Sequence, residues 1–370
     1  MRNAIKSSAW LLGIIFCAEW LAGVAAAAVQ KSEIFSAYTG TGFFNLQSTS
    51  IDTYDGNRAR HDTEYGRILW KGPEHRIDIE NMDLDKQWEI DPKRKRYTEC
   101  GIKEALENFE KEWKKDLEEA EKKNPQSKEN EPPYRVKVAK TTVAGPGAAV
   151  TLNGFTARPY TVKTVIEYET SAGHQPFGRQ TLFAKEWTSD DPRLSELAQH
   201  EAAVYQSTGP AFGAEERNQL QGLMQKEIAK AQSDPASNPW LQFWLSVDKL
   251  HGQPVRSITV LSGAPGYPEA AKTTASDDPH DDSLVQPGDL SNGVGGLLSG
   301  IAGHLATNKI NRSVEKKMAE RPAWVDEVSG EINRDVPGFA YLLEVKSVKT
   351  DGIPADLFEI PAGYKKVKSL

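Results

Sequence analysis

Residues 66–80, GRILWKGPEHRIDIE, decide the fold expected for this chain. Two short apolar runs flank a Lys-Gly-Pro turn, and in the second run Ile77 and Ile79 alternate with polar residues. Alternation with a period of two places one side of a strand against a core and the other side against solvent. The stretch therefore predicts a β-hairpin with one buried face.

The same kind of pattern recurs along the chain. It indicates strands within residues 32–98, 134–187, 250–261 and 339–367, separated by Gly, Pro and Asn turns. Short alternating strands joined by tight turns form antiparallel sheets. We therefore expect a single antiparallel sheet to which both ends of the chain contribute.

A targeting segment is expected over residues 1–28. Arg2 and Lys6 give it a positive start, an apolar stretch follows, and a run of alanines up to Ala28 offers the small residues that a signal peptidase needs. The apolar stretch is too short, and too interrupted by an acidic residue, for a convincing membrane span. We expect export, with cleavage between Ala28 and Val29; a retained N-terminal anchor is the alternative.

Cysteine usage is sparse. Cys17 lies inside the targeting segment, where Phe16 occupies the position at which lipid attachment requires a small residue, so lipidation is disfavoured. Cys100 is then the only thiol of the exported chain, and no intrachain disulfide can form. The fold must be stabilised by its core.

Composition and motifs exclude several classes of function. The chain carries 45 Lys and Arg against 52 Asp and Glu, a net charge of -7, whereas binding to nucleic-acid phosphates needs a basic surface. The sequence has no G-x-S-x-G, G-x-x-x-x-G-K-[ST] or H-E-x-x-H motif. Glu196 and His200 lie four residues apart on an expected helix but lack a third metal ligand. We expect no catalytic residues, no cofactor, no metal site and no nucleic-acid partner.

Three insertions interrupt the strands of one domain over residues 29–370: 101–133, 190–235 and 263–335. The first predicts an exposed, Glu- and Lys-rich helix, and the second begins as a helix after Asp191-Pro192. The third contains a glycine-dense apolar run at 293–305, which is too short to span a bilayer. That run is either a flexible cover or a flap that touches lipid.

The C-terminal stretch 355–367, ADLFEIPAGYKKV, resembles the closing F-x-[IV]-P-x-G-Y signature of an uncharacterised family of exported bacterial proteins. It predicts a last strand ended by a Pro-x-Gly turn, with Phe358 and Tyr364 available to anchor it on the core. More distantly, the arrangement is similar to the periplasmic lipoprotein carriers. That resemblance implies an α+β fold in which a strongly curved antiparallel sheet, an unclosed half-barrel, has an apolar concave face covered by helices.

We therefore expect an exported periplasmic or envelope protein that binds an apolar or acylated ligand, a lipid or a lipoprotein, in the concave face. A module for protein–protein interaction or sensing in the envelope is the alternative, and a hydrolase is the third. Peripheral contact with a membrane fits the first hypothesis. Six residues are candidates for the ligand-binding surface, although tryptophans such as these are more often plain core residues: Trp70, Trp88, Trp187, Trp244, Leu297 and Leu298.

Overall fold

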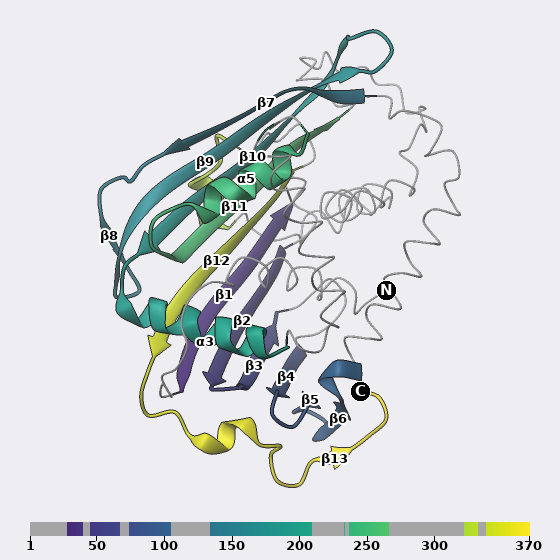
Figure 1. Ribbon diagram of the computed structural model, residues 1–370, viewed down its shortest axis with the longest axis vertical. Coiled ribbons are helices and arrows are strands. Elements are labelled where there is room, and N and C mark those ends of the chain that lie inside the picture. Colours follow the sequence, from purple (N-terminus) through teal and green to yellow (C-terminus); the bar gives the residue numbers. More distant parts are fainter. Residues whose placement is uncertain are drawn as a thin grey trace, which may run out of the picture.

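A single sheet of thirteen strands dominates the protein (Figure 1). The computed structural model describes residues 28–39, 45–66, 74–104, 134–208, 233, 237–265, 322–331 and 338–370. The strands are β1 (Val29–Thr39), β2 (Asn45–Asp55), β3 (Arg58–Tyr65), β4 (Glu74–Asn81), β5 (Lys86–Asp91), β6 (Arg96–Cys100), β7 (Tyr134–Ala144), β8 (Val150–Leu152), β9 (Phe155–Thr170), β10 (Pro176–Ser189), β11 (Gln253–Pro265), β12 (Gly338–Lys349) and β13 (Lys365–Lys366).

The order of the strands is β13-β6-β5-β4-β3-β2-β1-β12-β11-β10-β9-β7, with β8 paired to β9. Every pair is antiparallel except β13 with β6. The first strand of the chain pairs with the long strand β12 near its end, so two halves of the sheet join at the β1–β12 contact. The prediction of one antiparallel sheet built from both ends of the chain is confirmed in this arrangement.

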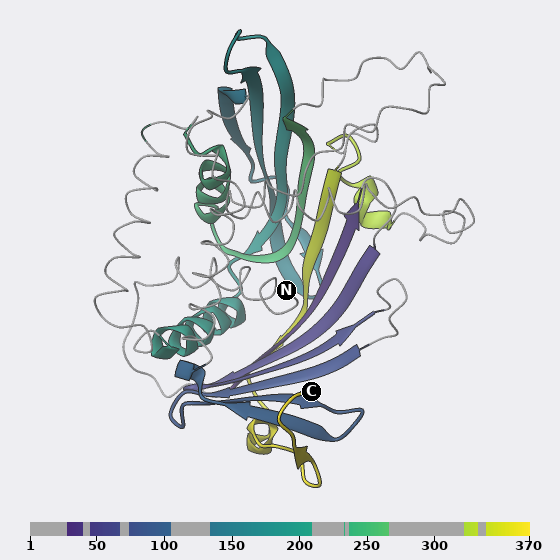
Figure 2. The ribbon, with the colours of Figure 1, turned by 90° about the vertical axis from the view of Figure 1, so that its right-hand side faces the viewer.

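The sheet is curved and open, as Figure 2 shows from the side. Two helices, α3 (Pro192–Thr208) and α5 (Pro239–Asp248), lie on its concave side. The short helix α8 (Ala323–Asp326) and the 3-10 turn η4 (Ala355–Phe358) lie on its convex side. The expectation of a sheet-dominated half-barrel is thus met.

The described helices meet separate parts of the sheet. Helix α5 packs against β7, β9 and β10, and α3 packs against β1, β2 and β12. Helix α5 was not expected from the sequence, although its start is well marked: the Asn238 side chain accepts a hydrogen bond from Leu241 N at 3.1 Å, and Pro239 occupies the first turn. The helix begun at Asp191-Pro192 is confirmed as α3.

A tight turn joins β8 to β9. Asn153 and Gly154 both have positive φ, 50° and 85°, as a two-residue hairpin of this hand requires. The Asn153 side chain also donates hydrogen bonds to Glu344 Oε1 at 2.8 Å and to Val345 O at 2.9 Å. This turn therefore attaches the β8–β9 corner to the central strand β12.

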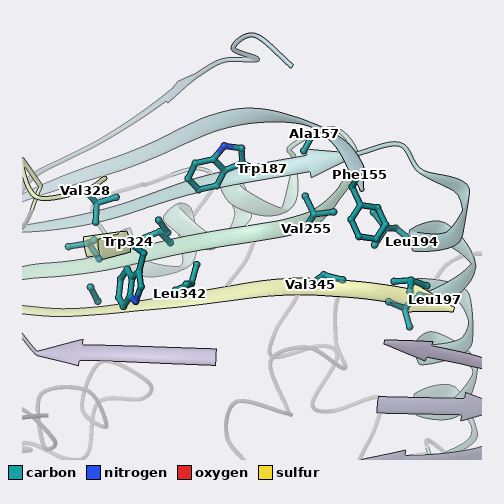
Figure 3. Close-up of a cluster of buried hydrophobic side chains, with 14 of the residues drawn as sticks. Phe155, Ala157, Trp187, Leu194, Leu197, Val255, Trp324, Val328, Leu342 and Val345 are labelled. Carbon is teal, nitrogen blue, oxygen red and sulfur yellow. The ribbon is translucent and has the colours of Figure 1, made fainter. Parts of the chain in front are cut away.

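The largest hydrophobic cluster includes the convex side of β10, β11 and β12 under α8 (Figure 3). Trp324 and Val325 of α8 are buried there, together with Trp187 of β10 and Leu342 of β12. The same cluster extends to the buried face of α3 through Leu197. Burying this apolar surface is worth about 25 cal/mol per Å² of area removed from water, so α8 is an integral part of the core.

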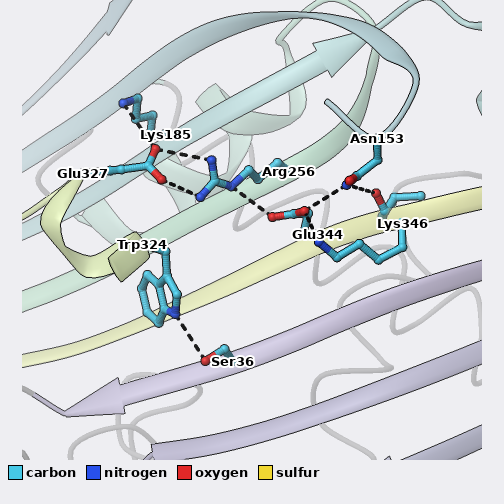
Figure 4. A network of polar contacts seen from close by, with 9 residues as sticks. Ser36, Asn153, Lys185, Arg256, Trp324, Glu327, Glu344 and Lys346 are labelled. Atoms are coloured by element: carbon cyan, nitrogen blue, oxygen red, sulfur yellow. Dashed lines mark hydrogen bonds and ion pairs between the residues drawn. The ribbon is translucent and has the colours of Figure 1, made fainter. Parts of the chain in front are cut away.

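On the convex side, Arg256 of β11 forms ion pairs that join the segment after α8 to strand β12 (Figure 4). Its guanidinium contacts Glu327 next to α8, with Nη2 at 2.5 Å from Oε1, and its Nε lies 3.3 Å from Glu344 of β12. The same guanidinium stacks over the Trp187 ring at 4.8 Å from the ring centroid. Arginine is suited to such a site because its planar group pairs with carboxylates and stacks on aromatic rings.

The closing signature departs from its expected structure. The prediction of a strand ended by the Pro-x-Gly turn is wrong: residues 355–358 form η4, 359–364 lie in no strand, and β13 follows the turn. Pro354 and Pro361 bracket η4 and lack the N–H groups that a strand uses. The anchoring is confirmed: Phe358 is buried, and Tyr364 packs against the cluster of Ile77, Ile79, Trp88 and Ile90.

Several expected elements lie outside the described residues. They are most of the 101–133 helix, residues 209–232 of the 190–235 insertion, the glycine-dense run and residues 1–27 of the targeting segment. The second strand of the predicted 66–80 hairpin is confirmed as β4, but the predicted pairing is wrong, because β4 pairs with β3 and β5 and not with residues 66–70. Within the described ranges, no helix is long and apolar enough to cross a membrane.

Candidate functional site

The concave face can be followed from strand to strand, because residues paired across neighbouring antiparallel strands point to the same side. One such row consists of Tyr160, Glu186, Ser257, Leu343 and Phe35 on β9, β10, β11, β12 and β1. Strand β10 shows which side of the sheet this row faces. Leu182 and Ala184 alternate with the residues between them and so point to the same side as Glu186, and both pack in the cluster of Phe243 on the concave helix α5. The row therefore faces the concave side.

An aromatic patch occupies the middle of this face. Phe35 and Phe339 flank the Tyr341 ring, with centroid distances of 5.9 and 6.0 Å. Leu343 and Leu261 share the same face by strand register, and all five side chains are half-buried. These five residues (Phe35, Leu261, Phe339, Tyr341 and Leu343) are called the aromatic patch below.

The aromatic patch lies between the two concave helices. Helix α5 packs over β7, β9 and β10, on one side of the patch. Helix α3 crosses the opposite ends of β1, β2 and β12, where Leu197 and Val204 share a cluster with Val29 and Val348. A mostly apolar surface between covering elements is the usual form of a small-molecule site.

A group of polar side chains borders the aromatic patch. Glu186 is only 4% exposed, and its Oε1 lies 2.5 Å from the Ser257 hydroxyl. Burial raises the pKa of the Glu186 carboxyl to about 7, and the hydrogen bond from Ser257 opposes the rise only in part. Burial also raises the pKa of the neighbouring Tyr341 phenol to about 12, against a hydrogen bond with Thr259. Glu186 thus titrates near neutral pH beside an apolar surface.

The other half of the concave face is polar. On β2 to β5 the strand register places on the concave side a set of polar residues that includes Asp52, His61, Arg76, Asp78 and Glu89. Arg76 pairs with Asp78 at 2.9 Å and with Glu89 at 3.0 Å. The apolar concave face implied by the resemblance to lipoprotein carriers is therefore restricted to β1, β11 and β12 and to the surfaces under α5 and α3, the latter including Tyr54 and Ala59.

A buried ion cluster connects α3 to the sheet. The Lys31 ammonium lies 3.2 Å from Glu201 of α3, 3.3 Å from Glu33 and 3.7 Å from Asp52. Burial alone would lower the pKa of Lys31, but attraction to these carboxylates outweighs burial and raises it. Asp52 also contacts His61 Nδ1 at 2.8 Å. The cluster holds α3 across the N-terminal half of the sheet.

Of the four tryptophans proposed as ligand contacts, the three that the structure describes are not brought together. Trp88 has convex parity, packs with Ile79 and donates a hydrogen bond to Glu99 at 3.0 Å. Trp187 lies on the convex side under α8, and only Trp244, half-buried on α5 with its ring 5.0 Å from that of Phe243, lies on the concave side. Trp70, Leu297 and Leu298 lie outside the described residues.

The residues of the aromatic patch were not singled out from the sequence. The run FAYLLEV at 339–345 is apolar at nearly every position, because its convex side packs in the core cluster and its concave side carries the aromatic patch. Alternation in such a strand does not identify the concave side. The sequence does show Phe35, Phe339 and Tyr341 in two expected strand regions, but only the structure shows that these strands pair.

No protein-family model and no curated protein matches this sequence. Among the described residues, no group of three or more His, Cys, Asp or Glu side chains is placed to hold a metal ion.

Proposed function

We propose that this protein is exported and binds an apolar or acylated ligand, a lipid or the acyl chain of a lipoprotein, against the aromatic patch. The observation that carries the proposal is the position of Phe35, Tyr341 and Leu343: half-buried, contiguous and on the concave face between α3 and α5. The helices then act as covers on either side of the bound chain, and the protein is of the α+β class.

Simple burial supplies the affinity in this scheme. Each methylene removed from water contributes about 0.8 kcal/mol, so a long acyl chain needs no dense set of polar contacts. The polar groups at the border of the patch, Glu186 and Ser257, restrict how the ligand lies. The polar half of the face, over β2 to β5, disfavours extension of the acyl chain in that direction.

Export is proposed on the sequence of residues 1–28 and is consistent with the position of β1. Val29, directly after the expected cleavage site, is fully buried and pairs with Tyr54 as the first residue of the strand. Cleavage there leaves the whole of β1 in the mature protein.

An envelope protein–protein interaction is the second candidate, and β7 favours it. This strand forms one edge of the sheet and exposes Val138 and Val143 at 45% and 53%. Exposed edge strands pair with extended segments of partner proteins. A partner on this edge would leave the aromatic patch unoccupied, so the two proposals differ in which surface a probe reaches.

Native mass spectrometry of the purified exported protein separates these proposals. We expect a mass increment from co-purified lipid, which delipidation removes and added fatty acid restores. Trp187→Phe, on the convex side, serves as a control that should bind lipid like the wild type. A protein that never carries or takes up lipid under these conditions would contradict the proposal and favour the interaction protein.

A further inference from the structure

A cleft of about 380 Å³ opens on the concave side where β9 begins and β10 ends, next to the start of α3. Its walls are polar and come from three separate segments of the chain. They include Thr156, Arg158, Tyr160, Thr188, Asp190 and His251. The volume falls within the range of small-ligand sites, roughly 300 to 1,000 Å³.

One wall is fixed by a hydrogen bond from β10. The Thr188 hydroxyl donates to the backbone oxygen of His251 at 2.5 Å, which holds the loop after α5 against the end of the strand. Gly252 follows in this loop with φ of 88°, and an added Cβ there would lie 3.0 Å from Ser189 O. The loop therefore packs closely on β10, and the cleft has a defined shape.

The charges in the cleft are of both signs. Arg158 is exposed and makes no hydrogen bond or ion pair with any other residue that the structure describes. Asp191 is neutralised by Arg193, whose Nη2 lies 2.7 Å from Oδ2. Within the described ranges, the Asp190 carboxylate pairs only with the His251 imidazole, at 3.3 Å, and its side chain is 71% exposed. The cleft thus offers a free guanidinium and an accessible carboxylate.

Tyr160 connects this cleft to the aromatic patch. It lines the cleft and begins the concave row that continues through Glu186 and Ser257 to Leu343 and Phe35. Four strand spacings separate β9 from β1, about 19 Å at 4.8 Å per spacing. The distance between the cleft and the patch is therefore comparable to the length of a long acyl chain.

We propose that the cleft binds the zwitterionic head group of an amphiphile, with a phosphate on Arg158 and an ammonium on Asp190. This inference rests on the proposed function, because the acyl chain of the same molecule occupies the aromatic patch. Arginine is the side chain best matched to phosphate, through two parallel N–H···O hydrogen bonds. The Thr156 and Tyr160 hydroxyls lie in the same walls and supply further donors.

The test compares three lysolipids that share one acyl chain and differ only in the head group. They are lysophosphatidylethanolamine, lysophosphatidic acid and a monoacylglycerol, each titrated below its critical micelle concentration into delipidated protein. The wild type should bind lysophosphatidylethanolamine most tightly and the uncharged monoacylglycerol about tenfold more weakly.

Two variants test which residue binds the phosphate and which binds the ammonium group. Arg158→Gln should weaken both phosphate-bearing lipids about tenfold and leave the monoacylglycerol unchanged. Asp190→Asn should weaken only the lysolipid with the ammonium group. Arg179→Gln, an exposed arginine with convex parity on β10, is the matched control and should change none of the three affinities.

The possible results separate failure of the head-group site from failure of the proposed lipid binding. Equal binding of all three lipids, unaffected by Arg158→Gln, overturns the head-group site and leaves the aromatic patch as the ligand surface. Failure of every lipid to bind, the monoacylglycerol included, overturns the proposed function and the head-group site together. Loss of phosphate preference in Arg179→Gln as in Arg158→Gln would show general surface electrostatics and would also overturn the site.

Discussion

Replacing Glu186 by Gln should make the protein's stability less dependent on pH. The carboxyl has a pKa of about 7 in the folded protein against an ordinary value of 4.5, because it is buried. At 1.36 kcal/mol per pH unit, this difference corresponds to about 3 kcal/mol. Gln has the same shape and carries no charge, so it removes this contribution and keeps the packing.

The direction in which the Glu186 contribution to stability changes with pH follows from proton binding. The folded protein binds the Glu186 proton more tightly than the unfolded chain does, so this group contributes most to stability below pH 4.5. Its contribution falls as pH rises and is lost once pH passes about 7. The free energy of unfolding of Glu186→Gln, relative to wild type, should therefore rise by about 3 kcal/mol between pH 4.5 and pH 8.

Urea unfolding, followed by tryptophan fluorescence at constant ionic strength over this pH range, measures the difference directly. Other carboxylates contribute equally to both proteins and cancel. Glu167→Gln, exposed on the neighbouring strand β9, is the control and should follow the wild type at every pH. Parallel pH profiles for Glu186→Gln and wild type would refute the reasoning that Glu186 is held as a buried acid.

Three further predictions concern the ion cluster, the β8–β9 turn and export. Lys31→Met should lower the free energy of unfolding by about 3 kcal/mol, because it leaves three partly buried carboxylates without their cation; a loss under about 1 kcal/mol in urea unfolding would show that solvent screens the cluster. Asn153→Ala should cost about 1 to 2 kcal/mol through its positive φ and its lost hydrogen bonds, and Asn153→Gly, which keeps the backbone geometry, should cost less in the same thermal or urea assay. N-terminal sequencing of the exported protein should begin at Val29 or within two residues of it, and finding Met1 or an acyl group on Cys17 would contradict cleavage.

The sheet could be predicted because its signal is local. Alternation at Ile77 and Ile79 follows directly from one buried face, and both residues lie in the core cluster of β4 and β5. The partner of β4 was mispredicted, because it is the preceding run at 58–65 and not 66–70. Helix α5 was missed although Asn238-Pro239 is a good helix start, because the ten residues after it are too apolar for a clear helical period. Its place over β9 depends on contacts far apart in the sequence.

The candidate site was harder to predict than the fold. The abundant tryptophans suggested residues that line a ligand site, but Trp88 and Trp187 point to the convex side of the sheet. Which side of the sheet a residue faces is known only once all strands are paired. Glu186 looks like a solvent-facing residue between Lys185 and Trp187 in the sequence. It is buried because neighbouring strands and their coverings close over it, which no local pattern encodes.

The most direct test of the account uses two neighbouring residues of β1. Phe35 lies on the concave face in the aromatic patch, and Ile34 is half-buried on the opposite face of the same strand. A fluorescent fatty acid titrated into delipidated protein should bind saturably to the wild type and to Ile34→Ser, and at least tenfold more weakly to Phe35→Ser. Equal weakening in both variants, or no saturable binding to the wild type, would contradict the claim that the concave aromatic patch binds an acyl chain.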